Sequence, residues 1–372
     1  MKYIEYINRL FYKSGKQGIP LSGTFELTSR CNLRCRMCYI HRQENDAAVQ
    51  QRELSADQWL SLAQDAKQRG MLLLLLTGGE PFLRPDFEQI YRGCHSMGLV
   101  LSINSNGTMI DDKAVDLLTR VPPQRVNITL YGASEDTYTR LCLNTAAYHS
   151  AYRAVEALTA AGIPVKLNYS VTPYNISDLP AVSSYASEHG LPLQAATYMF
   201  PPVRAAELSD CNPETQLSPE QSAQARWEHE LHTLPHDVLY RRAEAIVHNR
   251  DIAPIPTECQ DMPTEQIRCR AGLASFWVTF DGQLRPCGMM QTPSVSLAEH
   301  SFSDAWDGIR AARQNILIPA ACTACRYQTI CEACPAVCYA ESRSFTQKPS
   351  YLCRKMDAYV ALTSAWYMEN NA

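Results

Sequence analysis

Six short apolar runs, spaced about thirty residues apart, constrain most strongly how this chain of 372 residues can fold. Each run is bounded by a segment with helical periodicity. The runs are apolar on both faces, as strands of a parallel sheet covered by helices must be. They are TFEL at 24–27, LLLLLT at 72–77, LVLSIN at 99–104, RVNITL at 125–130, PVKLNYSV at 164–171 and LQAATYMF at 193–200.

The pattern predicts an α/β fold with a curved parallel sheet, an incomplete (β/α)6 barrel of the TIM type. Its helices are expected at 55–69, 83–97, 112–119, 149–161 and 177–189. We predict four parts: an N-terminal extension at 1–21, the partial barrel at 22–205, a helical bridge at 206–257 and a C-terminal domain at 258–372. In the last part, FWVTFDGQLRPC predicts a β-hairpin with Asp281-Gly282 at its turn.

Composition excludes several classes of function. The net charge of −4 offers no basic surface for nucleic acid or anionic lipid. The longest apolar run, Met71 to Leu76, is far too short to span a membrane, and the first residues lack a secretory signal, so we expect a cytoplasmic protein. Fifteen cysteines are unusual in a reducing cytosol, where clustered thiols serve metals more often than disulfides.

Three of these cysteines, Cys31, Cys35 and Cys38, follow directly on the first expected strand. They therefore lie at the carboxyl end of the sheet, where α/β proteins bind their ligands. Three thiolates on one loop can hold three irons of a [4Fe–4S] cube and leave the fourth iron for a small molecule. The alternatives are a structural zinc site completed by His41, or three unrelated core cysteines.

The spacing of these cysteines, followed by the aromatic Tyr39, resembles the signature of the radical S-adenosylmethionine (radical SAM) enzymes. TGGEP, with Gly78, Gly79, Glu80 and Pro81, ends the second strand as that family's glycine-rich motif does. We expect its glycines to let backbone approach a ligand. NSNG, with Asn104 and Asn106, resembles the ribose-contacting segment, although an Asn-Gly turn explains it equally well. The resemblance extends from residue 22 to about residue 200.

The resemblance implies that S-adenosylmethionine binds the open iron and is cleaved to a 5′-deoxyadenosyl radical, which abstracts a hydrogen from the substrate. ITLYGASEDTY at 128–138 resembles the fourth-strand segment, so Thr129 is expected at the methionine carboxylate. Arg153, or less readily Arg140, is expected as the positive partner, although each can equally be a solvated helix arginine. An electron donor such as flavodoxin or ferredoxin is implied as a partner.

A second group of cysteines resembles the SPASM extension, which carries two auxiliary [4Fe–4S] clusters and would bring the total to three. Mapped by order, the outer cluster is expected on Cys322, Cys325, Cys331 and Cys353. The inner cluster is expected on Cys259, Cys269, Cys287 and Cys334, with Cys338 as the alternative to Cys334. A zinc ribbon on Cys322, Cys325, Cys331 and Cys334 is the competing interpretation, but it leaves four other cysteines without a role.

The resemblance favours an oxidoreductase that modifies a peptide residue, in ribosomally made peptide maturation, by oxidation or a thioether or carbon–carbon crosslink. Gly288 stands where sulfatase-maturating members carry an acid, so that reaction is not expected. Cys211 follows the sixth strand and could donate hydrogen in a peptide epimerase, although an incidental loop cysteine is favoured. Dehydrogenation of a small metabolite and a zinc-binding interaction protein remain as alternatives. Cys94 and Cys142 are expected in the core.

Overall fold

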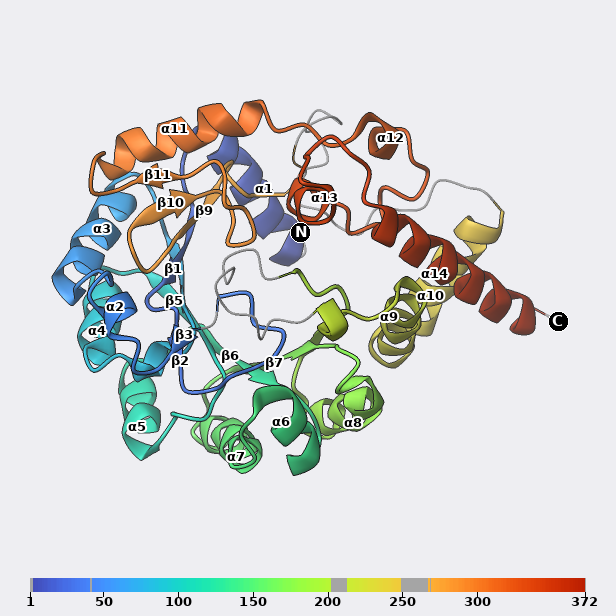
Figure 1. Ribbon diagram of the computed structural model, residues 1–372, viewed down its shortest axis with the longest axis horizontal. Helices are drawn as coiled ribbons and strands as arrows, with labels where there is room; N and C mark the ends of the chain where they lie inside the picture. Colours follow the sequence, from blue (N-terminus) through green and yellow to red (C-terminus); the bar gives the residue numbers. More distant parts are fainter. Residues whose placement is uncertain (1–2, 41, 202–212, 249–266, 268, 372) are drawn as a thin grey trace.

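The protein is described here by a computed structural model that covers residues 3–40, 42–201, 213–248, 267 and 269–371. Within these residues the main sheet has nine strands in the order β11-β10-β9-β1-β4-β5-β6-β7-β8 (Figure 1). The strands are β1 (Ser22–Glu26), β4 (Leu73–Thr77), β5 (Val100–Ser105), β6 (Arg125–Leu130), β7 (Val165–Ser170), β8 (Leu193–Ala196), β9 (Ser275–Val278), β10 (Gln283–Arg285) and β11 (Val295–Ser296). A two-stranded piece, β2 (Arg30–Cys31) and β3 (Arg42–Gln43), lies apart from it.

The six predicted strands form the parallel run from β1 to β8, so the α/β class and the partial barrel are confirmed. The pairings β1–β4, β4–β5, β5–β6, β6–β7 and β7–β8 are all parallel. Helices α3 (Ala56–Gln68), α4 (Phe87–Ser96), α5 (Asp112–Arg120), α7 (Ala147–Ala160) and α8 (Leu179–Glu188) lie around the outside of the curve (Figure 1). The short helix α6 (Glu135–Cys142), which the sequence pattern did not predict, sits between β6 and α7.

Local sequence explains where these helices start. Ser55 begins α3 with a capping box, in which its hydroxyl accepts the Gln58 N–H and the Gln58 side chain accepts the Ser55 N–H. Trp59, one turn later, is fully buried, and its ring centroid lies 4.8 Å from that of Phe25 on β1. Large aromatic side chains of this kind supply much of the hydrophobic stabilisation that fastens a helix to its sheet.

The predicted hairpin forms, but it does not stand apart from the barrel. Its first strand, β9, pairs in parallel with β1, in a register that sets Ser22 opposite Ser275. β10 then returns antiparallel to β9 across the turn at Gly282, whose φ of 79° is the left-handed conformation that glycine adopts without strain. The C-terminal part of the chain therefore extends the barrel sheet by three strands. How the chain divides into domains stays a prediction.

The remaining helices fall into two groups. Helices α1 (Tyr3–Lys16), α2 (Ala47–Gln50) and α11 (Phe302–Gln314) belong to the barrel half in Figure 1. Helices α9 (Pro219–Thr233) and α10 (His236–Val247) pack with the long α14 (Ser350–Glu369), while α12 (Ala320–Thr323) and α13 (Pro335–Ser342) lie nearby. The expected helical bridge thus corresponds to α9 and α10, each docked against the chain's last helix.

Lys355, on α14, is a buried link between the C-terminal segment and the barrel. Only 1% of its side chain is exposed, and its ammonium donates to Thr197 Oγ1 at 2.9 Å and Glu332 Oε2 at 2.6 Å. Burial lowers the pKa of Lys355, while the charge of Glu332 raises it. Thr197 follows the last barrel strand directly, and Glu332 lies between Cys331 and Cys334. The ammonium therefore positions a cysteine-bearing loop relative to the barrel.

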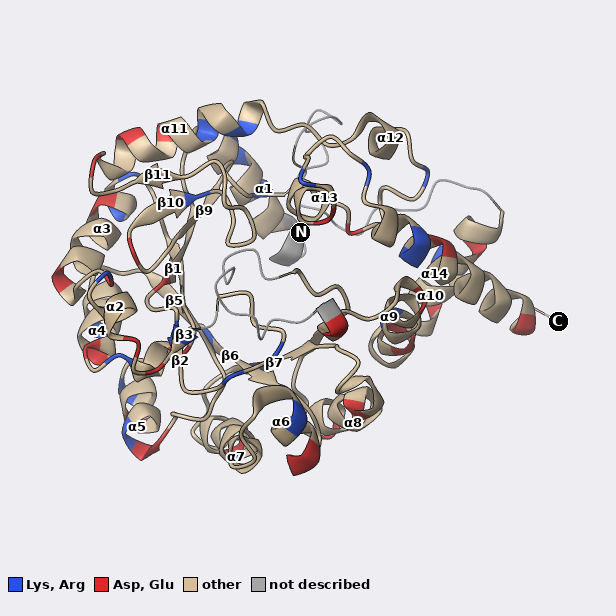
Figure 2. Ribbon diagram, viewed as in Figure 1, with Lys and Arg blue, Asp and Glu red and all other residues tan. Residues whose placement is uncertain are grey.

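Charged residues of both signs are mixed over the outer helices, for example on α3, α4, α5 and α11 (Figure 2). Such mixing is typical of a solvated surface. Within the described part of the chain, no helix combines the length and apolarity that a bilayer crossing requires.

We predict that Lys355→Met lowers the free energy of unfolding by about 1–3 kcal/mol, because the half-exposed Glu332 and the buried Thr197 hydroxyl both lose their partner. The neighbouring Arg354→Ala is the matched control. Arg354 is exposed and pairs with the exposed Glu220, so its loss should change stability by less than about 0.5 kcal/mol. Urea denaturation of the two variants measures this difference, and equal effects would refute the anchoring role.

Candidate active site

The three-cysteine loop forms one wall of a cavity of about 370 Å³ at the carboxyl ends of the parallel strands. The ends of β4, β5, β6, β7 and β8 also contribute to the lining. Of the predicted cofactor-binding residues, the cavity is lined by Tyr39, Gly78, Gly79, Asn104, Asn106 and Thr129, together with Cys31, Cys35 and Cys38. The structure therefore brings together motifs from four separate parts of the chain. The volume is in the range of small-molecule sites.

The three sulfurs influence one another electrostatically. Burial raises the pKa of Cys31 well above its ordinary value, and the nearby charges of Cys35 and Glu80 raise it further. Two N–H groups donate toward the Cys31 sulfur, from Asn106 Nδ2 at 3.6 Å and from the Leu33 backbone at 3.4 Å. Such donors favour a thiolate, which is the form that binds metal. The loop thus supplies three cysteine sulfurs, one of them with N–H donors, as an iron–sulfur cluster requires.

Gly78 and Gly79 are required for a different reason from the predicted one. A Cβ on Gly79 would lie 2.2 Å from the Arg30 carbonyl oxygen, and one on Gly78 would lie 2.4 Å from that of Thr28. The Gly79 N–H donates to Thr28 O at 2.7 Å. We expected the glycines to admit a ligand; the structure shows that they first admit the backbone that leads into the cysteine loop.

Glu80 and Pro81 lie behind the cavity wall and are not part of its lining. Glu80 is fully buried and accepts hydrogen bonds from three donors: the Ser105 hydroxyl, which lies 2.9 and 3.0 Å from the two carboxylate oxygens, the Asn106 N–H at 2.8 Å and the Phe82 N–H at 3.2 Å. Burial raises its pKa to about 7, against the lowering effect of these donors. Pro81 opens a single 3₁₀ turn that follows the glycines. Glu80 therefore ties the end of β4 to the end of β5.

The predicted positive partner is not in the cavity. Arg153 is exposed on α7, whose buried face carries Ala151, Ala154 and Val155, and Arg140 is an exposed residue paired with Asp136 on α6. Neither lines the cavity, so the structure does not support Arg153 as a ligand-binding residue. Cys211 and Cys259 lie outside the described residues.

The rest of the lining was not predicted as a group. It includes Tyr131, Tyr198, Phe200, Met37, Met199 and Met289. Among the described lining residues there is no Lys, Arg, His, Asp or Glu. Sequence reasoning could mark these residues only as apolar strand-end or loop positions. Because these side chains meet, one half of the cavity is uncharged and is lined by aromatic rings and methionine side chains.

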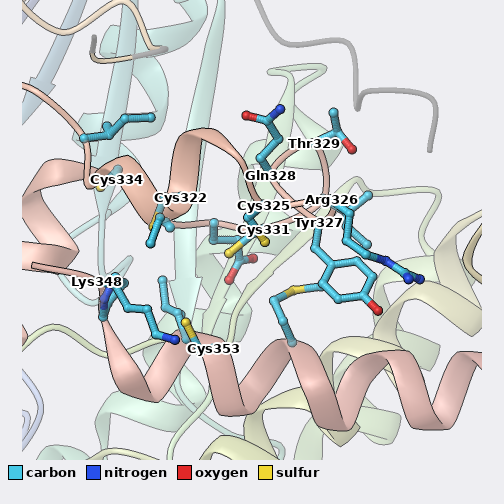
Figure 3. A pocket seen from close by; sticks show the side chains of 18 of the residues that line it. Cys322, Cys325, Arg326, Tyr327, Gln328, Thr329, Cys331, Cys334, Lys348 and Cys353 are labelled. Carbon is cyan, nitrogen blue, oxygen red and sulfur yellow. The ribbon is translucent and has the colours of Figure 1, made fainter. Parts of the chain in front are cut away.

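A second cavity, of about 610 Å³, is lined by six cysteines of the C-terminal part: Cys269, Cys322, Cys325, Cys331, Cys334 and Cys353. In Figure 3, Cys353 points from its helix toward Cys325 and Cys331, while Cys322 and Cys334 lie to one side. Burial raises the pKa of Cys331 to about 11, and Cys325 and Cys353 act on it electrostatically. These three thiols therefore form one neighbourhood.

Cys334 belongs to a different neighbourhood. Burial raises the pKa of Cys269 to about 12 and that of Cys334 to about 11, and in both cases Cys287 contributes. Cys338 is fully buried in α13, and the thiols that act on it are Cys322 and Cys334. The Cys287 sulfur accepts the Met289 N–H at 3.4 Å. Cys334 therefore lies near Cys269 and Cys287, while the division of these cysteines into an inner and an outer cluster stays a prediction.

Nowhere in the described ranges do three His, Cys, Asp or Glu side chains converge tightly enough to hold a single metal ion. In a zinc site four donors surround one ion, with Zn–S bonds of about 2.3 Å, whereas in a cube each thiolate binds its own iron. His41, which would complete the alternative zinc site of the three-cysteine loop, lies outside the described residues.

One hydrophobic cluster contacts both cavities. Phe200 and Met289 line the first cavity and also pack in one hydrophobic cluster with Cys287 and Cys334. Gly288, next to Cys287, leaves no room for an acid: a Cβ there would lie 2.9 Å from the Trp277 ring. A molecule in the first cavity would therefore sit beside the inner cysteine set.

Comparisons with known proteins agree with this geometry. Residues 25–186 match the Radical SAM superfamily. The AdoMet-dependent heme synthase of Methanosarcina barkeri is 24% identical over 88% of this chain and 94% of the relative. The sporulation killing factor maturation protein SkfB of Bacillus subtilis is 23% identical over 77% of this chain and 64% of the relative.

Solved structures share the fold over nearly the whole chain. Native anSMEcpe with bound AdoMet superposes with a TM-score of 0.68 at 16% identity, covering 95% of this chain and 100% of the other. Streptococcus suis SuiB bound to its precursor peptide SuiA gives a TM-score of 0.66 at 15% identity, covering 93% and 79%. The C-terminal segment therefore belongs to an architecture that occurs together with such barrels.

We predict that Glu80→Gln lowers the free energy of unfolding by about 1–3 kcal/mol, because its amide NH₂ would face backbone N–H groups that now find an acceptor. Glu88→Gln is the control, since Glu88 is exposed and pairs only with Arg92 one turn away, a contact worth at most about 0.5 kcal/mol. Urea denaturation at pH 8.5 measures both variants. An unchanged midpoint for Glu80→Gln would show that the carboxylate does not hold β4 to β5.

Proposed function

Because this chain is an enzyme of the radical SAM superfamily, we propose that it abstracts a hydrogen atom from a peptide residue and completes an oxidation or crosslink there. Cys31, Cys35 and Cys38 would hold a [4Fe–4S] cluster whose open iron takes S-adenosylmethionine. When bound, this pair supplies a 5′-deoxyadenosyl radical on one-electron reduction. The remaining catalytic tasks are binding, orientation and exclusion of water by this chain's own residues.

The observation that carries the proposal is the position of the first cavity. It joins the three-cysteine loop to the strand-end motifs and touches, through Phe200 and Met289, the inner cysteine set. Removing a hydrogen atom leaves a substrate radical, and a two-electron oxidation then requires one more electron to leave. A second redox centre beside the cavity offers a place for that electron, with Cys269, Cys287 and Cys334 as three of its proposed ligands.

The lining favours a neutral substrate group. Tyr198, Phe200 and the three methionines can enclose an apolar or aromatic side chain, and the described lining carries no charge to hold a carboxylate. Among the relatives, SkfB is by name the maturation protein of a sporulation killing factor, and SuiB was solved with a precursor peptide. We therefore favour a peptide substrate, with a flavodoxin or ferredoxin as the electron donor.

Synthesis of a haem-type tetrapyrrole is the second candidate. It is favoured by one observation: the heme synthase of M. barkeri matches over 94% of its own length. Haem carries two propionate carboxylates. Burying these charged groups would be unfavourable unless each were paired with a positive charge. A separate cavity, which shares Ile40 with the first, is lined by Arg42, Arg52 and Arg285 but also by Glu26 and Asp281, and Asp281 pairs with Arg52. Peptide epimerisation, which requires Cys211, and metabolite dehydrogenation remain further possibilities.

We predict that protein reconstituted without oxygen forms 5′-deoxyadenosine when given dithionite and S-adenosylmethionine, and that Cys35→Ala abolishes this. It should carry about twelve irons, and Cys35→Ala about eight, since each cube holds four. Cys94→Ala, at an equally buried cysteine of α4, is the control and should remain active. Chromatography and iron analysis provide the readouts. Wild-type protein that holds its iron but forms no deoxyadenosine would contradict the proposal.

Product mass separates the candidate reactions. Peptides encoded beside the gene, incubated with the enzyme, should lose two mass units on oxidation or crosslinking. Deuterium uptake from solvent at an unchanged oxidation level would instead indicate epimerisation. Turnover of an iron porphyrin, with all such peptides unchanged, would replace the peptide proposal with the tetrapyrrole one.

For the auxiliary clusters we predict that Cys334→Ala loses about four irons whereas Cys338→Ala keeps all twelve. Cys334 shares its electrostatic neighbourhood with Cys287 and Cys269, but Cys338 is a fully buried residue on the same short helix. Iron content and the Mössbauer spectrum of ⁵⁷Fe-reconstituted protein measure the difference. The reverse result would transfer the ligand role to Cys338.

A further inference from the structure

The base of the three-cysteine loop is closed by contacts within the chain itself. Arg30 and Cys31 form β2, which pairs in parallel with β3 just after the loop. Arg30 lies opposite Arg42, whose N–H donates to the Ser29 carbonyl at 3.0 Å. The Arg30 guanidinium also donates, through Nη1, to the Glu44 carbonyl at 2.8 Å. The segments that enter and leave the loop are therefore joined where they meet.

A buried carboxylate, that of Glu53, binds the entering segment at this base. Only 6% of its side chain is exposed. One oxygen accepts from Arg30 Nε at 2.8 Å and from the Thr28 hydroxyl at 2.5 Å, and the other accepts from Arg30 Nη2 at 3.0 Å. The Thr28 hydroxyl in turn accepts the Arg30 N–H at 2.9 Å. Two parallel bonds between a carboxylate and a guanidinium fix the orientation of both groups.

Arg84 joins the same network from the chain that follows the TGGEP motif. Its Nη1 lies 3.5 Å from Glu53 Oε2 and donates to the Leu27 carbonyl at 2.9 Å. Its other nitrogens donate to the Leu54 carbonyl at 3.0 Å and to the Asp86 carboxylate at 2.7 and 2.9 Å. Two guanidiniums thus face two carboxylates, so the buried charges balance within the network.

This network supports the site without binding a ligand itself. Its members Thr28, Arg30, Glu53 and Arg84 do not line the first cavity. Their polar groups bind one another and backbone carbonyls. Cys31, which follows Arg30 directly, does line the cavity. The network therefore acts on the cavity through the position of the loop.

The middle of the loop is held separately, by the end of α6. The Arg34 N–H donates to the Cys142 carbonyl at 3.2 Å, and the Arg36 N–H donates to that of Leu141 at 3.0 Å. With the base and the middle both fixed, the backbone between them has little freedom. Groups that orient metal ligands without touching the metal typically contribute 10–100-fold to metal affinity or activity.

We propose that Glu53 is a positioning residue: through Arg30 and Thr28 its carboxylate holds the base of the loop in the geometry in which Cys31 binds the cluster and the cluster takes S-adenosylmethionine. The inference rests on the proposed function, since it requires that cluster, but it does not depend on which substrate is modified. Glu53 belongs to none of the sequence motifs that mark the site.

The chain offers a matched control in Glu230, a second buried carboxylate that lies between two arginines. It accepts from Arg226 Nε at 3.0 Å and from Arg242 Nη1 at 2.7 Å, and only 13% of its side chain is exposed. It lies on α9 and does not line the first cavity. Glu53→Gln and Glu230→Gln should both lower the urea midpoint, because each leaves two arginines without their carboxylate. We expect only Glu53→Gln to affect the loop.

Two measurements on reconstituted full-length protein test this. The first titrates S-adenosylmethionine against the EPR signal of the reduced cluster that it perturbs. Glu53→Gln should bind S-adenosylmethionine about tenfold more weakly, whereas Glu230→Gln should keep the wild-type affinity. The second is hydrogen–deuterium exchange of the peptide that covers residues 30–39, which should be faster in Glu53→Gln alone. Thr28→Val removes one donor to the carboxylate and should shift both readouts by a smaller amount in the same direction.

The inference is overturned if Glu53→Gln keeps the wild-type affinity and exchange, or if Glu230→Gln changes both to the same extent. If Glu53→Gln does not fold, Thr28→Val decides the question on the same two readouts. Failure of the proposed function would look different, because wild-type protein itself would then have no signal that S-adenosylmethionine perturbs. Exchange of residues 30–39 would still report on the loop in that case.

Discussion

The close contact between two backbone segments, Thr28–Arg30 and Gly78–Glu80, underlies the candidate active site. Past the paired strands β1 and β4, the chain continues to exchange hydrogen bonds, with Gly79 N–H on Thr28 O at 2.7 Å and Glu80 N–H on Arg30 O at 3.0 Å. No side chain fits between them. The start of the cysteine loop is therefore fixed against the end of β4. Glu80 in turn links the end of β4 to Ser105 and Asn106 at the end of β5. The ends of β1, β4 and β5 are therefore held together.

The two cysteine-lined cavities differ in a way that suits different tasks. The first combines sulfurs with amide, hydroxyl and backbone groups at strand ends, and so can recognise a polar cofactor on one side and an apolar group on the other. The second is enclosed mainly by the chain around α12, α13 and α14 and is lined by six further cysteines. Phe200 and Met289 line the first cavity and pack in the same hydrophobic cluster as Cys287 and Cys334, of which Cys334 lines the second cavity.

Local patterns predicted much of this arrangement. Each barrel strand lies within a few residues of its apolar run, and the motifs at the ends of β1, β4 and β5 meet in one cavity because parallel strands end at the same edge. Three features depended on information that a single sequence does not carry. Arg153 fell on the outer face of α7, because helix phase decides which residues face inward. The pairing of β9 with β1 joins residues some 250 positions apart, and no local periodicity reports such a contact. The end of α6, a helix that the pattern did not indicate, contacts the cysteine loop, where the Cys142 carbonyl accepts the Arg34 N–H.

The parallel pairing of β9 with β1 affects how the protein folds while it is being synthesised. As the ribosome releases the chain from its N-terminus, β1 can pair with β4 early, but its other edge has no partner until the segment around Ser275–Val278 emerges. An uncovered strand edge invites pairing with other chains. A nascent barrel of this kind would therefore benefit from a chaperone during the time between the synthesis of β1 and the synthesis of β9.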